Sequence, residues 1–390
     1  MKKIAHSVVE VLRSVLPASD FVPLHIPEFE GNEKRLLAEC IDSNFVSYLG
    51  EFVTRFEGML SEFTGSKRIL ATVNGTAALH ACLEAVGVKA GDEVLMPALT
   101  FVATANAVSY CGAVPHFVDV EERTLGVDPF KLAEYLRAVA EIADGECINR
   151  KTGARIRAIV PMHAFGHPVD MDPLLEVCRE YRLSIVEDAA ESLGSYYKGK
   201  HTGTHGRVAA LSYNGNKVIT TGGGGAILTD DDELADRAKH LTTTAKVPHK
   251  WEYRHDTVGF NYRLPALNAA LGCAQMERLP DFLERKRRLA EKYREAFEGF
   301  DGVRFFTEPE FARSNYWLNA LVLDRPDTEL RNEILEQTNN AGIMTRPVWT
   351  LLHRLPMYKD CPQMNLETSE SLEARIINIP SSAYLGDNRS

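Results

Sequence analysis

Short apolar segments alternate with helical patterns through the middle of the chain. The apolar segments lie at 68–72, 93–96, 114–120, 157–162, 183–186, 208–212 and 226–229. Between them, segments with apolar residues on one helical face lie at 77–86, 100–109, 129–143 and 172–181. Short strands that alternate with helices predict an α/β fold, with a mostly parallel central sheet that helices cover on both faces. In such sheets, ligands bind at the carboxyl ends of the strands.

The chain on either side of this alternation predicts an N-terminal arm and a second, smaller domain. The first residues form an amphipathic helical pattern, and Pro23 and Pro27 then keep the following segment extended. Helices are predicted at 33–42 and 51–64. We therefore divide the chain into an N-terminal helix and arm (1–32), a large cofactor-binding domain (33–279) and a small C-terminal α+β domain (280–390).

A long helix is predicted to link the large domain to the small one. Apolar residues recur there at helical spacing, at Phe282, Leu289, Tyr293 and Phe297. Pro280 is expected to kink or break this helix, because proline removes a backbone donor. We interpret the basic run Arg285–Arg288 as a solvated helix face. Strands of the small domain are predicted near 319–323 and 375–379.

Composition and charge narrow the classes of function. The 390 residues are 45% hydrophobic and 25% charged, and the net charge of −10 argues against nucleic acid or an anionic membrane as a partner. No apolar run reaches the roughly 18 residues of a membrane span. The N-terminus does not have the pattern of a signal peptide, so we expect a cytoplasmic protein. The seven cysteines are scattered without a CxxC pair, which argues against disulfides and a cysteine-rich zinc site. No metal site is predicted, and Cys82 and Cys178 are expected in the core.

Two segments at strand ends are suited to a planar, phosphorylated ligand. Asn74-Gly75-Thr76 enters a helix, where free backbone N–H groups and the helix dipole favour a phosphate. A plain N-cap by Thr76 is the alternative. Phe101 follows the strand that ends near Pro97, where its ring could cover a planar ligand. Core packing is the alternative for this ring.

Two carboxylates follow the strand at 183–186. Asp188 ends the apolar run, and burial of a carboxylate there is costly without a cationic partner, such as a protonated ring nitrogen. Glu191 lies three residues further on, on the same side if a helical turn begins here. An N-cap aspartate followed by a surface glutamate is the alternative.

One lysine lies between the last two apolar strands. Lys217 follows Ser212 by five residues and precedes four consecutive glycines, Gly222–Gly225. A desolvated lysine can condense with a carbonyl, and glycines let a ligand approach the backbone. A solvated lysine beside a hairpin turn is the alternative. Together these segments offer an amine nucleophile, a carboxylate for a pyridinium nitrogen and a phosphate-binding site (the phosphate seat) at Asn74-Gly75-Thr76. This combination predicts pyridoxal 5′-phosphate as the cofactor. No GxGxxG motif favours a dinucleotide instead.

The chain resembles one family, the fold-type I, pyridoxal-phosphate-dependent nucleotide-sugar aminotransferases of the DegT type. The motifs that carry the resemblance are NGTAALH (Asn74–His80), GDEVLMPALTFVATANAV (Gly91–Val108), EDAAESLGS (Glu187–Ser195), SYNGNK (Ser212–Lys217), TGGGGAI (Thr221–Ile227) and GFNYRLPALNAALG (Gly259–Gly272). These motifs extend the resemblance over nearly the whole chain. The resemblance implies the fold predicted above.

The resemblance also implies a role for each candidate residue. Lys217 is the expected catalytic residue, which holds the cofactor as a Schiff base, and Asp188 is expected to pair with the pyridinium nitrogen. The other implied cofactor contacts are Gly75, Thr76 and Ser212 to the phosphate, Phe101 stacked on the ring and Glu191 to the phenolic oxygen. Many family members carry Gln or His in place of Glu191, and Gly-Glu-Gly-Gly in place of Gly222–Gly225.

A homodimer with a shared active site is a further implication. In this family the residue at Asn261 reaches the cofactor phosphate of the neighbouring subunit, and Arg263 is a candidate near the same boundary. A local turn with a surface arginine is the alternative. Candidates for substrate selection are His25, Phe29, His163, Trp349 and His353. Trp317 and Trp349 could equally belong to the core of the small domain.

The four glycines, SYNGNK and the segment PLHIPEFEGNE look most like the legionaminate/bacillosamine branch of the family. That branch implies amination at carbon 4 of a UDP- or GDP-linked 4-keto-6-deoxy-N-acetylhexosamine, with L-glutamate as donor, for a bacterial surface glycan. Some relatives are dehydratases with histidine in place of the lysine, so Lys217 favours transamination. The alternatives are amination of another keto sugar, including an eight-carbon acid sugar, sugar dehydration, and a non-catalytic cofactor-binding regulator.

Overall fold

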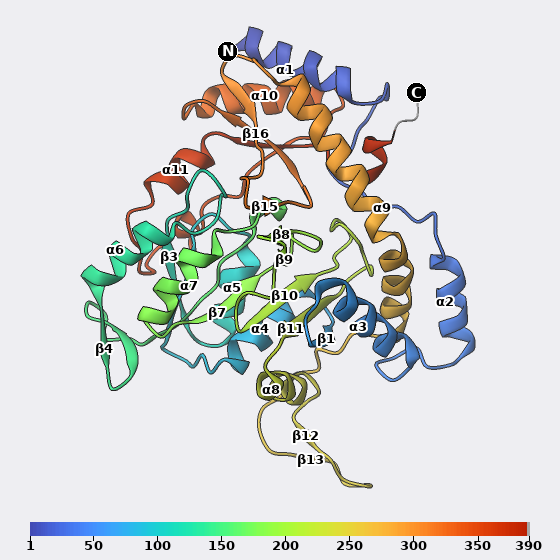
Figure 1. Ribbon diagram of the computed structural model, residues 1–390, viewed down its shortest axis with the longest axis vertical. Helices are drawn as coiled ribbons and strands as arrows, with labels where there is room; N and C mark the ends of the chain where they lie inside the picture. The colour runs from blue at the N-terminus through green and yellow to red at the C-terminus, as the bar shows by residue number, and fades with distance from the viewer. Residues whose placement is uncertain (388–390) are drawn as a thin grey trace.

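A seven-stranded sheet forms the centre of the computed structural model, which describes residues 1–387 (Figure 1). Its strands, in spatial order, are β1 (Arg68–Thr72), β11 (Gly225–Thr229), β10 (Val208–Ser212), β7 (Ser184–Asp188), β6 (Ile156–Ile159), β2 (Glu93–Pro97) and β3 (Val114–Val118). Only β11 runs against its neighbours. The predicted, mostly parallel sheet is therefore confirmed, and the carboxyl ends of all strands except β11 meet at one edge.

Helices cover both faces of this sheet because apolar side chains of each strand alternate between the faces. The helices α4 (Gly75–Ala85), α5 (Val102–Tyr110) and α8 (Asp232–Thr242) share one apolar core, into which Val186 of β7 points. Ile185, the preceding residue, points to the opposite face, against α6 (Pro129–Val139) and α7 (Met171–Glu180). The helices α2 (Glu33–Asp42) and α3 (Glu51–Thr64) also cover that opposite face and have the predicted bounds.

The helix predicted at 129–143 is too long. The helix α6 ends at Val139, and β4 (Ala140–Ala143) then pairs antiparallel with β5 (Glu146–Asn149). Asp144 and Gly145 between these strands have φ of 50° and 85°. An Asp-Gly pair with positive φ forms a tight hairpin turn whose twist matches the strands, and this local signal prevails over helix propensity.

The C-terminal residues form a smaller antiparallel sheet. Its strands, in spatial order, are β14 (Val303–Phe305), β16 (Asn319–Leu323), β18 (Ile376–Ile379) and β17 (Arg346–Pro347). The helices α10 (Thr328–Asn340) and α1 (Lys2–Val15) lie side by side at the top of Figure 1 and share an apolar core with this sheet. The first helix therefore packs with the C-terminal part of the chain, while the division at residues 32 and 279 remains a prediction.

Short elements complete the fold. They are β8 (Tyr196–Tyr197), β9 (Lys200–His201), β12 (Lys246–Val247), β13 (Arg254–His255), β15 (Ala312–Arg313), α11 (Glu367–Glu373) and the 3₁₀ turns Ala164–Gly166, Leu352–Arg354 and Ala383–Gly386. All seven cysteines are free, as predicted, and Cys82 and Cys178 are buried. Within residues 1–387, no helix has both the length and the apolar character needed to cross a membrane.

The long helix α9 (Ala266–Ala296) runs diagonally from near α1 at the top of Figure 1 down to α2 and α3, and it is not broken at Pro280. Proline cannot donate to the carbonyl of Met276 one turn earlier, which removes one hydrogen bond of the helix. Leu279 and Phe282, on either side of the proline, are both buried in the core under α2 and α3. The predicted break is therefore absent, and tertiary packing keeps the helix continuous across Pro280.

The basic run Arg285–Arg288 is not a solvated face, contrary to the prediction. The guanidinium of Arg285 is buried and pairs with Glu28 at 2.8 Å and with Asp387 at 2.6 Å. These carboxylates lie far away in the sequence, on the N-terminal arm and at the C-terminal end. Arg285 therefore fastens both ends of the chain to α9.

Lys286 is 1% exposed and has no carboxylate among its hydrogen-bond partners. Its amine lies 3.1 Å from Nε2 of His25 and donates to the backbone carbonyls of Trp317 and Ser381. Burial lowers the pKa of Lys286 to about 7, because the charged amine loses its hydration.

We predict that Lys286 makes the stability of the protein depend on pH. The pKa of this lysine is about 7 in the folded chain and about 10.4 in an unfolded chain. Between these values the unfolded chain binds a proton that the folded chain does not. The free energy of unfolding therefore rises with pH there, by about 1.4 kcal/mol per pH unit.

Urea unfolding across this pH window measures the slope. The variant Lys286→Met should lose the contribution, and Lys198→Met, at an exposed position, should keep it. Equal slopes for the wild type and Lys286→Met would contradict the assignment.

Candidate active site

A cavity of about 300 Å³ opens at the carboxyl ends of β1, β10 and β7. The predicted cofactor residues that line it are Gly75, Thr76, Phe101, Asp188, Glu191, Ser212 and Lys217. Residues from separate strand ends thus meet in one place, as the parallel sheet requires.

The phosphate seat lies at the start of α4. Asn74, and not Thr76, caps this helix, since its side-chain oxygen accepts a hydrogen bond from the N–H of Ala77 at 2.8 Å. The first N–H groups of a helix have no partner within it, so those at Gly75 and Thr76 are available to an anion. A Cβ on Gly75 would lie 2.8 Å from Cβ of Ser212, so only glycine lets this helix start so close to the end of β10.

Asp188 ends β7 in a buried position and has few partners. Its carboxylate accepts hydrogen bonds from the hydroxyl of Thr104 at 2.7 Å and from the N–H of Ala190 at 3.2 Å. Burial raises the pKa of Asp188, while the bond from Thr104 opposes this shift. A carboxylate that is desolvated and incompletely paired is stabilised by a cationic partner in the cavity.

The neighbouring carboxylate, Glu187, has all its hydrogen-bond partners within the protein. It accepts hydrogen bonds from Nε2 of His163 at 3.0 Å and from the N–H groups of Gly203, His205 and Gly206 at 2.7, 2.7 and 2.5 Å. Burial alone would raise the pKa of Glu187, but the bond from His163 and these N–H groups lower it to about 2. Glu187 is therefore a buried anion that fixes the end of β7.

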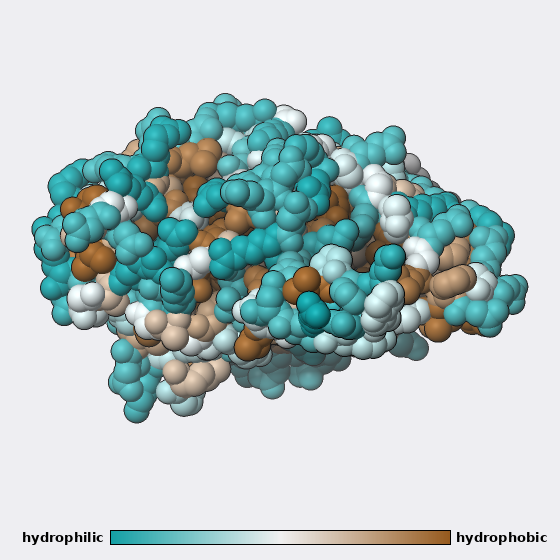
Figure 2. All heavy atoms as spheres, turned by 90° about the horizontal axis from the view of Figure 1, so that it is seen from below, coloured by the Kyte–Doolittle hydropathy of each residue, from teal (hydrophilic) through white to brown (hydrophobic). Residues whose placement is uncertain are grey.

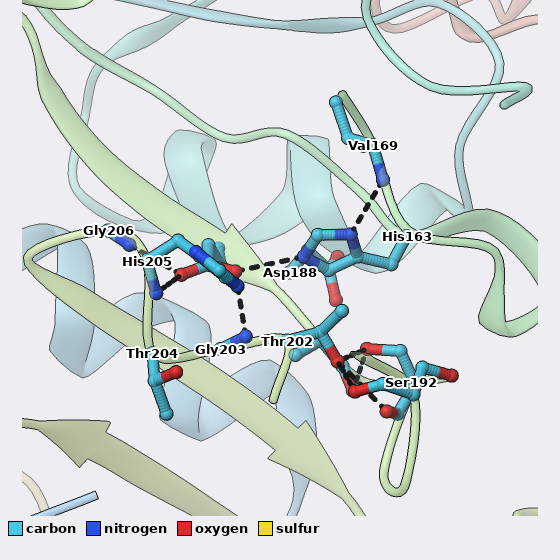
Figure 3. A network of polar contacts seen from close by, with 12 residues as sticks. His163, Val169, Asp188, Ser192, Thr202, Gly203, Thr204, His205 and Gly206 are labelled. Atoms are coloured by element: carbon cyan, nitrogen blue, oxygen red, sulfur yellow. Dashed lines mark hydrogen bonds and ion pairs between the residues drawn. The ribbon is translucent and has the colours of Figure 1, made fainter. Parts of the chain in front are cut away.

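The prediction of His163 as a substrate contact is wrong. The side chain is fully buried, and both ring nitrogens are used inside the protein. Nδ1 accepts a hydrogen bond from the N–H of Val169 at 3.1 Å, so the proton lies on Nε2, which donates to Glu187 (Figure 3). His163 thus supports the strand that carries Asp188 and does not face the cavity.

Lys217 lies in the loop between β10 and β11, with its amine between a carboxyl group and an aromatic ring. Nζ is 3.4 Å from Oε1 of Glu191 and 3.9 Å from the centre of the Trp317 ring. Burial raises the pKa of Glu191 to about 7, and the charge on Lys217 opposes this shift. The other oxygen of Glu191 accepts from the N–H of Phe165 at 2.8 Å, which aims the first at the lysine.

The remaining substrate candidates are scattered. Trp349 lines the cavity, and its ring centre lies 6.4 Å from that of Phe101. His25 lies behind the cavity against Lys286, and the cavity lining includes neither it nor His353, which lies 3.4 Å from Glu370.

The candidates for a shared site lie outside the cavity. Asn261 is exposed, and its side-chain oxygen accepts from Arg263 at 2.8 Å. The guanidinium of Arg263 in turn lies 3.4 Å over the ring of Tyr48. Phe29 is also on the surface, 51% exposed.

Two residues of the site were missed by sequence reasoning. Trp317 lies two residues before β16 of the small C-terminal sheet, and its pattern gives no reason to prefer the site over the core. Thr104 donates to Asp188 and lies one helical turn after Thr100, with 3.0 Å between their hydroxyls. A pair of threonines four apart at the start of a helix is a weak signal that could have found it.

The fold and the cavity define a fold-type I, pyridoxal-phosphate-dependent aminotransferase. The residues fit this cofactor: a helix start open to a phosphate, a buried carboxylate short of partners and an amine within one cavity. The chain belongs to the DegT/DnrJ/EryC1/StrS aminotransferase family, whose model matches residues 27–389. It is a pyridoxal-phosphate-dependent sugar aminotransferase.

Known relatives cover most of the chain. A GDP-perosamine synthase from Caulobacter vibrioides is 36% identical over 362 residues, or 92% of each chain. The putative pyridoxal phosphate-dependent aminotransferase EpsN from Bacillus subtilis is 36% identical over 332 residues, 85% of this chain and 82% of EpsN. The crystal structure of a DegT DnrJ EryC1 StrS aminotransferase from Brucella abortus has a TM-score of 0.82 at 29% identity and covers 90% of this chain and 91% of that one.

We predict that Glu187→Gln is strongly destabilising although Glu187 does not face the cavity. The amide would place N–H groups against backbone N–H donors and would leave His163 without its anion. Loss of one partner in a buried ionic network costs about 3–5 kcal/mol. Urea unfolding measures the loss, and Asp172→Asn, which breaks a surface pair with Lys198, is the matched control with little expected change. Equal stability of the two variants would refute the role given to Glu187.

Proposed function

We propose that this enzyme transfers the amino group of L-glutamate to carbon 4 of a nucleotide-linked 4-keto-6-deoxy-N-acetylhexosamine, for a bacterial surface glycan. The observation that carries the proposal is the meeting of Lys217, Asp188 and Glu191 in one cavity at the sheet edge. The sugar-nucleotide class is supported by the name of the Caulobacter vibrioides relative, a GDP-perosamine synthase. The N-acetylated substrate rests on the resemblance to the legionaminate/bacillosamine branch.

The bound cofactor supplies a carbonyl that takes up the amino group and a ring that accepts carbanion charge. Asp188 keeps the ring nitrogen protonated, because a buried carboxylate stabilises the adjacent cation. The N–H groups at Gly75 and Thr76, with the hydroxyl of Ser212, hold the phosphate. Lys217 moves the proton between carbon centres, and the Trp317 ring beside it excludes water from its amine.

A homodimer completes the site in this proposal. Asn261 is exposed beside β1, where it could reach the phosphate of a second copy. Exposed aromatic residues lie nearby on the hairpin β12–β13, with Trp251 75% and Tyr253 82% exposed. Figure 2 views the molecule from the side of this hairpin and shows hydrophobic side chains among hydrophilic ones. Apolar residues exposed together favour a protein interface.

Replacement of Lys217 tests the catalytic assignment. The variant Lys217→Ala should lose turnover with glutamate and a keto sugar nucleotide, and also the visible absorbance of the lysine-bound cofactor, because no other amine in the cavity can replace it. Lys200→Ala, at an exposed position of β9, is the control and should retain both. Unchanged amination by Lys217→Ala would contradict the catalytic role proposed for Lys217.

A panel of keto sugar nucleotides tests the substrate. Mass spectrometry of the products should show a single amino group added at carbon 4 of the N-acetylated 4-keto sugar with UDP or GDP. Preferential amination of another keto sugar, or loss of water without amination, would overturn the substrate assignment while leaving the aminotransferase chemistry intact.

Glu191 should make the rate depend on pH near neutrality. Its carboxyl keeps a proton up to about pH 7, because burial raises its pKa to that value. Below this pH it can donate to the phenolic oxygen of the cofactor, and above it the donor is lost. We expect kcat/KM of the wild type to fall as the pH rises through about 7. Glu191→Gln, a donor at every pH, should lack this fall, and identical pH profiles would contradict the role.

A further inference from the structure

A second cluster of metal-ligating side chains lies outside the cofactor cavity. His80 and Glu84 face the same side of α4, one turn apart, and Cys111 caps the end of α5. Their ligand atoms all lie within 4.8 Å of one another, with 3.9 Å between Nε2 of His80 and Oε1 of Glu84. The cofactor chemistry uses none of the three.

The histidine in this cluster has an unpartnered nitrogen. His80 is 3% exposed, and its Nε2 is buried without a hydrogen-bond partner among residues 1–387. Its Nδ1 lies 3.1 Å from the hydroxyl of Tyr262. When Nδ1–H donates to that hydroxyl, Nε2 presents a lone pair toward Glu84 and Cys111. A metal-bound histidine is oriented in the same way, by a hydrogen bond at its other nitrogen.

The other two side chains complement this nitrogen. Oε1 of Glu84 lies 3.9 Å from Nε2 of His80, and the buried thiol of Cys111 lies within 4.8 Å of both. Arg237 is the cation that faces Glu84, and among the described residues the two form no ion pair.

We propose that His80, Glu84 and Cys111 bind a borderline divalent metal ion of the zinc type. Imidazole, thiolate and carboxylate together favour Zn²⁺ over Mg²⁺ or Ca²⁺, which prefer oxygen ligands. Ligand atoms around tetrahedral Zn²⁺ lie about 3.3–3.6 Å apart, so atoms that are now up to 4.8 Å apart need to close by roughly 1.5 Å at most. Cys111 releases its thiol proton to solvent as the metal–sulfur bond forms and a water leaves the ion. A water from the adjoining groove completes the coordination.

The proposed metal site would connect helices whose N-terminal ends line the cofactor cavity. The helix α4 carries the phosphate seat at its start, and Phe101 is the N-cap of α5. Tyr262, which bonds His80, is adjacent to Asn261. A bound ion would hold these segments at the ends away from the cavity, so its expected effect is on stability rather than on the chemical step.

Equilibrium dialysis of the holoenzyme against Zn²⁺, with the metal measured by mass spectrometry, tests the proposal. The wild type should hold one Zn²⁺ per chain beyond the amount held by Cys111→Ser, and Zn²⁺ should raise its melting temperature. Cys178→Ser removes a buried thiol elsewhere and should bind as the wild type does.

Glu84→Gln keeps the test decisive if the serine variant folds poorly, because this side chain is 30% exposed and the amide preserves its shape. It should weaken binding by at least about tenfold. A Cd²⁺ difference spectrum should show a new thiolate absorption in the wild type and none in Cys111→Ser. Equal Zn²⁺ content in the wild type, Cys111→Ser and Glu84→Gln would overturn the proposal.

Discussion

The site depends on two adjacent carboxylates at the end of one buried strand. Glu187 and Asp188 point to opposite faces of β7, and neither reaches water. The protein supplies Glu187 with a histidine and three backbone N–H groups, but it supplies Asp188 with only a hydroxyl and one N–H. In the proposed function, a cationic ring in the cavity would supply the partner that Asp188 lacks, while the hydrogen bonds of Glu187 hold the end of the strand in place.

Strand order explains how the other groups reach this carboxylate. Because β10 lies between β7 and β11, the loop that leaves β10 begins beside the end of β7, and its Lys217 lies 3.4 Å from Glu191, which follows β7. Lys217 lies on that loop, and its return strand, β11, pairs with β1, which leads into the phosphate seat. A Cβ on Gly225 would lie 2.6 Å from the backbone of Asn74, so glycine is needed where this hairpin passes the seat. The hairpin turn that was the alternative interpretation of Gly222–Gly225 is therefore present. The same hairpin also lies against the candidate site.

Sequence reasoning found the parts of the site that lie at strand ends. Lys217, Asp188, Ser212 and Gly75 each follow a short apolar strand, so the sheet alone brings them together. Sequence reasoning failed where the ion-pair or hydrogen-bond partner of a side chain is distant in the sequence. The sequence around Arg285 predicts a solvated side chain, because the two carboxylates that pair with it, Glu28 and Asp387, lie 257 and 102 residues away. His163 was misplaced because its position after a strand does not reveal which of two faces its ring takes.

Trp317 shows why the cavity residues that lie outside the central sheet could not be predicted. Its ring lies over Lys217. Asn315 donates to the carbonyls of Glu191 and Leu193 at 2.9 Å each, and its oxygen accepts from the N–H of Trp317 at 2.8 Å. A Cβ on Gly166 would lie 1.8 Å from that oxygen, so this glycine admits the asparagine. Asn315 therefore fixes the backbone of Trp317 to the segment that carries Glu191, while the ring nitrogen of Trp317 donates to the carbonyl of Asn216, next to Lys217, at 2.7 Å.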